Sequence, residues 1–431
     1  MPSFSRTRPL ARSLMDLSSN VPDSARWRQG AKACPRGLQR KPDRFRLSMH
    51  WTIRDVDPSS WDALAGDNAL AAHGWLLTVE RCWLADFEPL YIVVALDEEV
   101  VGGTVCYVTR QSPRSETLDD LLWGRLRGAA TRAGASFLPA LVCGPARGYG
   151  WHIGVRVGLH MHHQQAVRRR ILDAMEEEAD RRGLPLSFTL VLGQETELRA
   201  LLGERGYFVT RNMPIAVLDV PWVSMEEYLR HLPRKRRLEY QRQQRRNHEA
   251  GTRFEILDKN EEWDHRFLTL LDRNVRTHGA TGLSFDDAFI GELRKNLGDR
   301  ALRIVARKGG AISGAYLVLR QGEAALAYAV GVDPDLGRND FTYFQLAYHV
   351  LIDYAIRYGI KRIYYGRGMY DLKVRRGCFL VESSVYTRVK GSRRPLYAAW
   401  YGISSRWNRY KLLRQVKPDA SYSLFGPARS G

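Results

Sequence analysis

The chain has 431 residues, 44% of them hydrophobic, and a formal net charge of +19. A single hydrophobic core stops growing at roughly 250–300 residues, so we expect two domains of ordinary globular composition. No apolar stretch approaches the roughly 18 residues that cross a bilayer, and the first residues lack the apolar block of a secretory signal. These features argue against a membrane-spanning protein, leave peripheral membrane contact open, and make the cytoplasm the expected location.

Cysteine and histidine usage predicts neither a disulfide framework nor a metal site. The five cysteines are far apart, odd in number and without a C-x-x-C pair, unlike a zinc site or a set of structural bridges. The stretch HMHH (160–163) has no supporting carboxylate or cysteine cluster, and successive residues seldom converge on one ion. The cysteines are Cys34, Cys82, Cys106, Cys143 and Cys378.

Residues 1–48 hold eleven Lys/Arg and three Asp, a net +8 of the total charge. Their Pro, Ser and Gly content without apolar periodicity predicts a disordered tail. Met49 begins the regularly patterned part of the chain and is an alternative start. The remaining +11 is still basic, and a field of this sign attracts nucleic acid, a membrane surface or phosphorylated substrates.

Strand and helix patterns from residue 49 to 220 predict a first α/β domain. Its predicted elements are a helix at 59–85, a hairpin at 90–108 with a bulge at Gly102–Gly103, a strand running into a glycine-rich loop at 136–150, a helix at 166–183 that ends at Gly183, a strand at 186–193, and a helix, turn and strand at 197–220.

A second domain, 221–431, repeats this order, with the boundary near 220–225. Alternating strands and helices indicate helices on both faces of each sheet. The predicted elements are a basic helical stretch at 232–251, a strand at 253–258, a helix at 261–279, three successive strands at 301–332, a long helix at 341–359 and a strand at 361–366.

Three segments carry a resemblance to a known family. They are the basic stretch LPRKRRLEYQRQQRRNHEAG (232–251), the three strands of 301–332 with their following helix, and YYGRGMYDLKVRRG (364–377). In this order and spacing the chain resembles the FemABX-like and related GNAT-type acyltransferases over about residues 51–390, most strongly from 195 to 380. The resemblance implies two tandem GNAT-like domains, each a mixed, largely antiparallel sheet flanked by helices.

The late element contains the candidate catalytic residues. Lys373 follows a predicted strand, where ligands of open α/β sheets bind, and the resemblance gives it the role of stabilising negative charge on a carbonyl oxygen. Asp371 and Tyr370 lie within range to orient the acceptor amine or relay its proton. The alternative is a solvated lysine in a basic loop. Other residues expected at the substrate cleft are Tyr365, Gly366, Gly368, Arg376 and His278; the alternative for His278 is a helix-end histidine.

The basic stretch is the candidate donor-binding surface. Like charges this close repel one another, and phosphates would balance them; a solvated basic face is the alternative. The seven cations are Arg234, Lys235, Arg236, Arg237, Arg242, Arg245 and Arg246.

The acyl donor is left open between two classes. Acetyl-CoA enzymes of this fold hold pyrophosphate with R/Q-x-x-G-x-G/A at a strand-to-helix turn. The literal match at 125–130 follows no strand, 143–150 lacks the final small residue, and 337–340 departs from the pattern. An aminoacyl-tRNA donor is favoured by these poor motifs and by the basic charge. The resemblance to Fem-type enzymes, which use charged tRNA, favours it as well. The chain lacks the coiled-coil insertion of some Fem members.

The leading hypothesis is therefore a Fem-like acyltransferase that moves an aminoacyl group from aminoacyl-tRNA to an amine of a small-molecule or cell-wall-precursor acceptor. The ester is already activated, so positioning and oxyanion stabilisation suffice and no metal or redox cofactor is expected. One alternative keeps the fold and uses acyl-CoA. A second is a non-catalytic GNAT-like module that binds RNA, to which the tail 406–417, with Arg, Lys, Trp and Tyr, would contribute.

Overall fold

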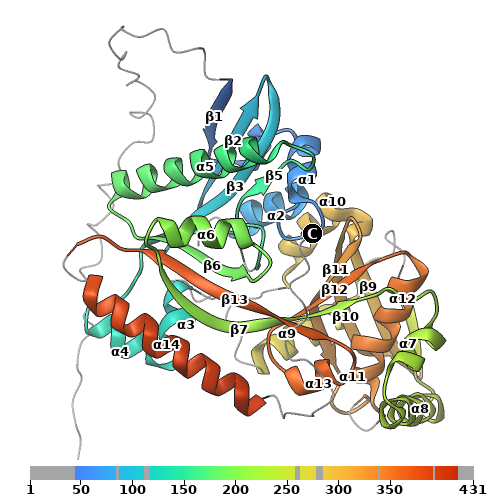
Figure 1. The fold of residues 1–431 in the computed structure, drawn as a ribbon. Coiled ribbons are helices and arrows are strands. Elements are labelled where there is room, and N and C mark those ends of the chain that lie inside the picture. Colours follow the sequence, from blue (N-terminus) through green and yellow to red (C-terminus); the bar gives the residue numbers. More distant parts are fainter. Residues whose placement is uncertain are drawn as a thin grey trace, which may run out of the picture. The chain divides into compact units, whose positions relative to one another are not determined.

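The computed structural model describes residues 44–83, 87–110, 117–146, 148–257, 263–277, 285–337, 340–391 and 394–415. From Arg44 onward the chain forms one unit (Figure 1). The strands of this unit are β1 (Phe45–His50), β2 (Phe87–Leu96), β3 (Glu99–Thr109), β4 (Ala140–Cys143), β5 (Gly154–Val155), β6 (Leu186–Leu192), β7 (Phe208–Asp219), β8 (Arg253–Leu257), β9 (Ala301–Lys308), β10 (Ala311–Gln321), β11 (Ala324–Val332), β12 (Arg362–Gly366) and β13 (Phe379–Arg388).

Helices flank both halves of the sheet. One of them contains a π-helical stretch, Gln345–Val350, between α11 and α12. The helices are α1 (Pro58–Ala65), α2 (His73–Trp83), α3 (Leu118–Trp123), α4 (Arg127–Arg132), α5 (Met161–Arg182), α6 (Thr196–Glu204), α7 (Met225–His231), α8 (Arg234–Glu249), α9 (His265–Thr277), α10 (Asp287–Leu297), α11 (Thr342–Phe344), α12 (Leu351–Arg357), α13 (Tyr370–Val374) and α14 (Arg394–Gln415), with short 3-10 turns at Ile53–Asp55, Gly124–Leu126 and Gly298–Arg300.

The predicted repeat of elements is confirmed. Each half has an antiparallel meander, β1 to β4 or β8 to β11, followed by a helix and then by a strand parallel to the last strand of the meander. The α/β class with mixed, largely antiparallel sheets is likewise confirmed. Within the described residues, however, the strands form one continuous sheet in the order β1-β2-β3-β4-β6-β13-β7-β12-β11-β10-β9-β8.

The expectation of two separate sheets is therefore wrong, because the halves exchange their last strands. β7, from the first half, pairs with β12 of the second half. β13, from the second half, pairs with β6 of the first, and β13 and β7 pair with each other. Figure 1 shows these two strands side by side through the middle of the molecule. The predicted domain boundary near residue 220 stays a prediction.

Two predicted limits change in the first half. Residues 45–48, assigned to the tail, belong to β1 and pair with β2, so the sheet begins before Met49. The helix predicted at 59–85 is two helices, because Gly66, with a φ of +55°, ends α1. The predicted bulge is confirmed beside Gly102, where the β2–β3 register shifts after Val94.

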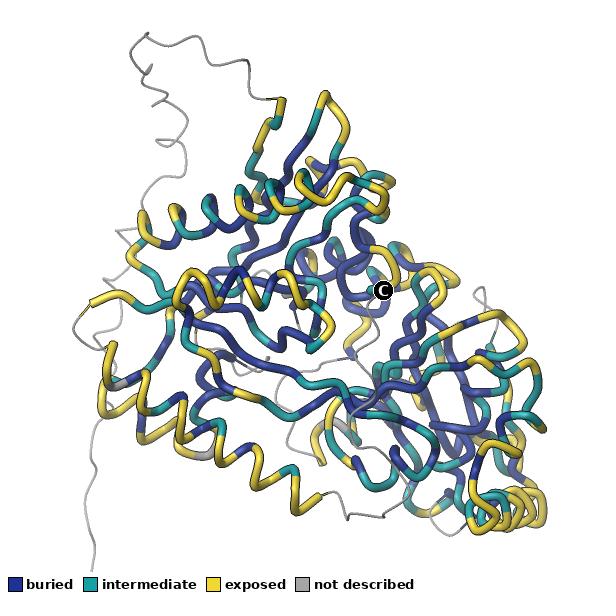
Figure 2. The backbone as a smooth tube through the Cα atoms, viewed as in Figure 1, coloured by how far each residue is buried: buried dark blue, intermediate teal, exposed yellow. Residues whose placement is uncertain are grey.

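An apolar core joins the helices of the two halves. Trp75 of α2 is fully buried and meets Phe289 of α10 edge to face, with ring centroids 6.2 Å apart. Leu271 of α9 belongs to the same cluster. Figure 2 shows the sheet strands buried along most of their length. Burying aromatic and leucine side chains stabilises by roughly 1.5–3 kcal/mol each, so the halves share one core.

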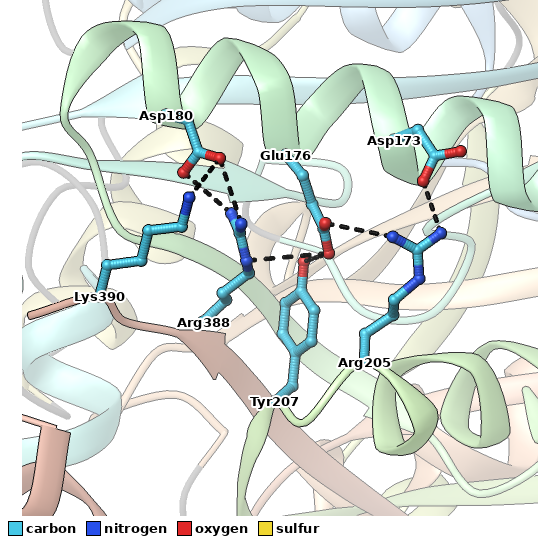
Figure 3. Close-up of polar contacts among 7 residues, drawn as sticks. All are labelled: Asp173, Glu176, Asp180, Arg205, Tyr207, Arg388 and Lys390. Carbon is cyan, nitrogen blue, oxygen red and sulfur yellow. Dashed lines mark hydrogen bonds and ion pairs between the residues drawn. The ribbon is translucent and has the colours of Figure 1, made fainter.

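A network of charged groups ties α5 to the exchanged strand β13 (Figure 3). Arg388, at the end of β13, donates two hydrogen bonds of 3.1 Å to Asp180 of α5. The other members bind the same helix face: Lys390 with Asp180, Arg205 with Asp173 and Glu176, and Tyr207 with Glu176. Networks of several charges hold better than isolated surface pairs.

Candidate functional site

A cavity of about 650 Å³ lies where the two halves of the sheet meet. Its walls come from the loop after β4, the middle of β6, α3, and the facing parts of β11 and β12. A neighbouring cavity of about 350 Å³ shares Leu70, Tyr149 and Leu326 with it. The wall residues that matter below are Gly144, Tyr149, Thr189, Tyr365, Gly366 and Arg367.

The cavity forms because two pairs of parallel strands separate. β4 pairs with β6 only from Leu141 to Cys143, and β11 pairs with β12 only from Ala324 to Leu326. Beyond these short ladders, Leu190 in β6 and Gly366 in β12 take positive φ values of 57° and 68°. Ligands of open α/β sheets bind where neighbouring strands part in this way.

Two tyrosines of the cavity wall carry buried hydroxyls. Within the described part of the chain, the buried hydroxyls of Tyr149 and Tyr365 have no hydrogen-bond partner. Burial raises the pKa of both well above the usual value, so both remain neutral donors. A buried donor left unpaired costs about 1–3 kcal/mol, and neither hydroxyl is exposed to the cavity in this structure. Sequence analysis placed Tyr365 at the cleft and missed Tyr149.

Lys373 lies directly behind the cavity wall and is 5% exposed. Its Nζ donates to the carbonyl oxygens of Tyr365, Gly366 and Arg367, at 2.7, 3.2 and 3.1 Å. All three of those residues line the cavity. Burial lowers the pKa of Lys373 to about 8, so the ammonium is mostly charged at neutral pH. Lys373 is thus no solvated lysine, and its predicted contact with substrate stays a prediction.

The neighbours of Lys373 have partners of their own. Tyr370 is fully buried and donates to the carbonyl of Pro214 at 2.8 Å, and burial raises its pKa to about 12. Asp371 forms an ion pair with Arg375 at 2.7 Å. Tyr370 therefore anchors α13 to β7. Proton relay by Tyr370 or Asp371 stays a prediction.

The remaining predicted cleft residues fall in different places. Gly366 and Gly368 have φ values of +68° and +78°, and an added Cβ would meet nothing within 4 Å, so backbone conformation is what requires glycine. Arg376 lies beneath the rings of Tyr348 and Phe344, 4.5 and 4.9 Å from their centroids, and does not line the large cavity. His278 lies outside the described residues.

The basic stretch forms α8, and several of its cations are already engaged. Arg236 pairs with Glu239 at 3.1 Å and Arg246 with Glu249 at 3.9 Å. Arg237 donates to the Leu232 carbonyl at 2.6 Å, and Arg242 stacks over Phe341. Arg234, Lys235 and Arg245 are exposed. The repulsion that seemed to require phosphates is thus partly relieved within the protein, and phosphate binding stays a prediction.

A second cavity, open and about 560 Å³ in volume, lies beside α8. It is lined by Lys235, Arg236, Arg242 and, from the end of α13, Arg375. α13 is therefore linked to both cavities: its Lys373 holds wall residues of the large one, and Arg375, directly after the helix, lines the basic one. A five-residue helix is about 7.5 Å long, so the two cavities are close neighbours.

Among the described residues, which omit 147, 338 and 339, neither half shows a loop that would hold pyrophosphate at a helix N-terminus. The literal motif match at 125–130 is helical, with Gly128 inside α4. In the first half, α5 begins only at Met161, well after β4 ends at Cys143. In the second half, the carboxylate of Asp340 accepts from the backbone N–H and the hydroxyl of Thr342 at the helix start. An acidic side chain of the protein thus caps this helix start.

Sequence analysis also missed a buried ion pair behind the loop after β4. His152 is fully buried, with Nδ1 2.8 Å from Glu195 and Nε2 2.7 Å from the carbonyl of Thr189. Burial favours the neutral ring, but Glu195 and the Thr189 carbonyl outweigh it and raise the pKa of His152 to about 9. The pair are 43 residues apart, so no local sequence signal marks them.

The histidines of 160–163 lie at the start of α5, with His160 and His162 in contact at 2.8 Å. Among the described residues, no three His, Cys, Asp or Glu side chains converge in a way that would hold a metal ion. In the same residues no helix has the length and apolar character needed to span a bilayer.

The family model FemAB_like, described as peptidoglycan biosynthesis/recognition, matches residues 52–392. No curated protein matches the chain. Among solved structures, FemX matches with a TM-score of 0.54 and 13% identity over 80% of this chain and 98% of FemX. The C-terminal domain of a putative lysylphosphatidylglycerol synthetase from Agrobacterium fabrum matches at 0.50 and 12%, over 82% and 96%. A tandem GNAT protein from the clavulanic acid pathway matches at 0.44 and 12%, over 81% and 99%.

Proposed function

The chain belongs to the FemAB-like family and is an acyltransferase, and from this premise we propose that it transfers an aminoacyl group. The donor is an aminoacyl-tRNA, and the acceptor is an amine of a small molecule or of a cell-wall precursor. The family's description as peptidoglycan biosynthesis/recognition supports a cell-wall acceptor. The reaction belongs in the cytoplasm, where charged tRNA is present.

The observation that carries the proposal is the link that α13 makes between two cavities, through Lys373 on the wall of the large one and Arg375 in the basic one. One is basic and open, with Arg375 at its edge. The other lies between the separated strand pairs, with Tyr149 and Tyr365 among its wall residues. A donor with several phosphates and an ester at its end fits this pair, with the phosphates at α8 and the ester in the large cavity.

In the reaction, the acceptor amine attacks the ester carbonyl, a C–N bond forms, and the bond to the ribose oxygen breaks. The amine loses one proton and the leaving ribose oxygen gains one, so no other reactant is required. Negative charge develops on the carbonyl oxygen in the transition state. Fixed donors at a developing charge lower the barrier. The hydroxyls of Tyr149 and Tyr365 are proposed to serve as such donors only after the wall rearranges to expose them, since both are buried in this structure.

Lys373 is proposed to act through the cavity wall. Three carbonyls occupy its ammonium, so it contacts a substrate oxygen only if one carbonyl gives way. While they remain bound, it fixes residues 365–367 and so the Tyr365 hydroxyl. In this proposal Lys373 is a positioning residue, and Tyr370 supports it by anchoring α13.

The donor experiment compares charged tRNA, acetyl-CoA and a long acyl-CoA, each with an amine-bearing peptidoglycan-precursor peptide. Charged tRNA alone should support transfer. If only an acyl-CoA does, the donor assignment is wrong and the acyl-CoA alternative replaces it. If tRNA binds and no donor turns over, the chain is a non-catalytic RNA-binding module.

Salt dependence tests the α8 surface. The triple variant Arg234→Gln, Lys235→Gln, Arg245→Gln should raise KM for tRNA and spare kcat. The slope of log K against log salt should flatten by roughly 0.7–0.9 for each phosphate that the variant no longer binds. A matched triple removes three exposed arginines elsewhere: Arg54→Gln, Arg169→Gln, Arg253→Gln. Equal effects of the two triples would show only a general charge effect and contradict an α8 site.

A further inference from the structure

The outer side of α14 combines exposed apolar side chains with cations. Ile403, Trp407 and Tyr410 are 56%, 57% and 51% exposed. They are three or four residues apart, so they lie on one helix face. Figure 2 shows the helix exposed along its outer side. Large aromatic side chains gathered on a solvent face mark an interaction surface.

The opposite face anchors this helix to the protein. Tyr401 is buried, and its carbonyl accepts from the hydroxyl of Thr210 in β7 at 3.0 Å. Asn408 donates to the carbonyl of Arg211 at 2.9 Å. This face is thus already covered by β7, and the exposed stripe is not a core face that lacks its cover.

The charge of α14 indicates which kind of partner binds its outer face. The helix, RPLYAAWYGISSRWNRYKLLRQ, contains five cations and no acid. Four of the cations lie in its second half, around the exposed stripe: Arg406, Arg409, Lys411 and Arg414. A basic helix with an exposed aromatic stripe lies at a membrane interface, with rings at headgroup depth and cations at lipid phosphates. We infer that the outer face of α14 binds an anionic lipid surface.

Two other partners fit this face less well. RNA bases would stack on ring faces, but Lys411 lies over the Trp407 ring at 5.5 Å and Arg414 over the Tyr410 ring at 5.7 Å. The exposed Ile403 also offers nothing to RNA. A second copy of the chain would set two acid-free basic helices against each other, and their like charges repel.

Because α14 packs against α3, lipid binding by α14 also sets how far the large cavity lies from the membrane. Trp400 of α14 donates to the Leu122 carbonyl of α3 at 3.2 Å and stacks on Trp123 at 4.1 Å. α3 in turn supplies Leu118 and Leu121 to the wall of the large cavity. Docking therefore brings the cavity within one helix layer of the lipid headgroups. Membrane binding itself does not depend on the proposed reaction.

Cosedimentation of the full chain tests the inference, using phosphatidylcholine vesicles with and without phosphatidylglycerol. Binding should require phosphatidylglycerol and weaken with salt. The double variant Arg406→Gln, Lys411→Gln should bind about 25-fold more weakly, at about fivefold per cation near an anionic surface. The control double variant, Arg169→Gln with Arg253→Gln, removes the same charge elsewhere and should change binding far less.

Tryptophan quenching by brominated lipid locates the contact. Trp407→Phe should remove most of the quenching, whereas Trp51→Phe, which replaces a tryptophan of similar 55% exposure elsewhere, should not. Equally weakened binding in the two double variants, or quenching unchanged in Trp407→Phe, would overturn the inference. Two other results would also overturn it. One is a double variant Arg406→Gln, Lys411→Gln that loses tRNA affinity and keeps vesicle binding. The other is a dimer of the native chain that Trp407→Phe abolishes.

Discussion

Raising the pH should loosen the cavity wall through the buried pair of His152 and Glu195. Nδ1 of His152 faces the Glu195 carboxylate, and Nε2 faces the carbonyl of Thr189. Both neighbours are acceptors, so both ring nitrogens must carry a proton and the ring is a cation. Glu195 also accepts from the backbone N–H groups of His152 and Leu192. The pair thereby fixes the loop after β4 against β6.

The pKa shift of His152 sets how much the pair adds to the free energy of unfolding. The pKa of His152 rises from the usual 6.5 to about 9, and each unit corresponds to 1.36 kcal/mol. The folded state binds the proton more tightly than the unfolded state, so the pair contributes about 3 kcal/mol, fully present below pH 6.5. That contribution is lost progressively as the pH rises from about 6.5 to about 9. Lys373 acts oppositely at higher pH, because its lowered pKa makes stability rise between about 8 and 10.5.

Urea unfolding isolates this effect. The native chain and His152→Asn are compared at several pH values from about 6 to about 9. The variant should be less stable by about 3 kcal/mol near pH 6, and the gap should narrow towards pH 9. His349→Gln is the matched control. Burial, with Arg376 nearby, lowers the pKa of His349 to about 3, so this ring is neutral when folded but takes up a proton below about pH 6.5 when unfolded. The cost of its replacement should therefore rise slightly from about pH 6 to about pH 7.5 and stay level above that, opposite in direction to the His152 gap. A His152 gap that is constant with pH, or that widens as pH rises, would refute the reasoning.

Three further outcomes follow from the described contacts. Lys373→Met should lower stability by about 2–4 kcal/mol and lower kcat, because three carbonyls lose their donor; urea unfolding and kinetics check this, and partial rescue by Lys373→Arg would favour a positioning role. Gly366→Ala and Gly368→Ala should each cost about 1–2 kcal/mol in the same unfolding assay, because positive φ strains an L-residue. Removing residues 1–48 should lower Tm by several degrees relative to removing 1–43, because 45–48 pair in β1; equal Tm values would contradict this.

Local pattern was enough to predict most elements. The strands of 301–332 and the helix that ends at Gly183 followed from apolar runs and from glycine punctuation. The strand exchange could not be predicted from the sequence, because β7 and β13 are far apart in sequence and their apolar patterns fit either half. Pairing between distant strands depends on register across the whole sheet, which local periodicity does not encode.

The site was predictable only in part for the same reason. Lys373 was found through its motif, but its direction is fixed by contacts with carbonyls, which sequence does not display. Tyr149 and His152 depend on partners distant in the chain, and nothing local distinguishes them. The pairs Arg236–Glu239 and Arg246–Glu249, in contrast, are three residues apart on one helix and were visible in the sequence.

Strand exchange gives the cavity its fixed geometry. One wall, at residues 189–190, belongs to β6, which pairs with β13. The opposite wall, at 365–367, continues β12, which pairs with β7. Because β13 and β7 are hydrogen-bonded to each other, the two walls belong to one sheet and cannot separate without breaking its central ladder. A transfer between two substrates requires both to be held in register, and positioning of this kind lowers the barrier by restricting relative motion. In the proposed site the exchanged strands therefore serve positioning: they join the wall carrying Tyr365 to the one held by His152.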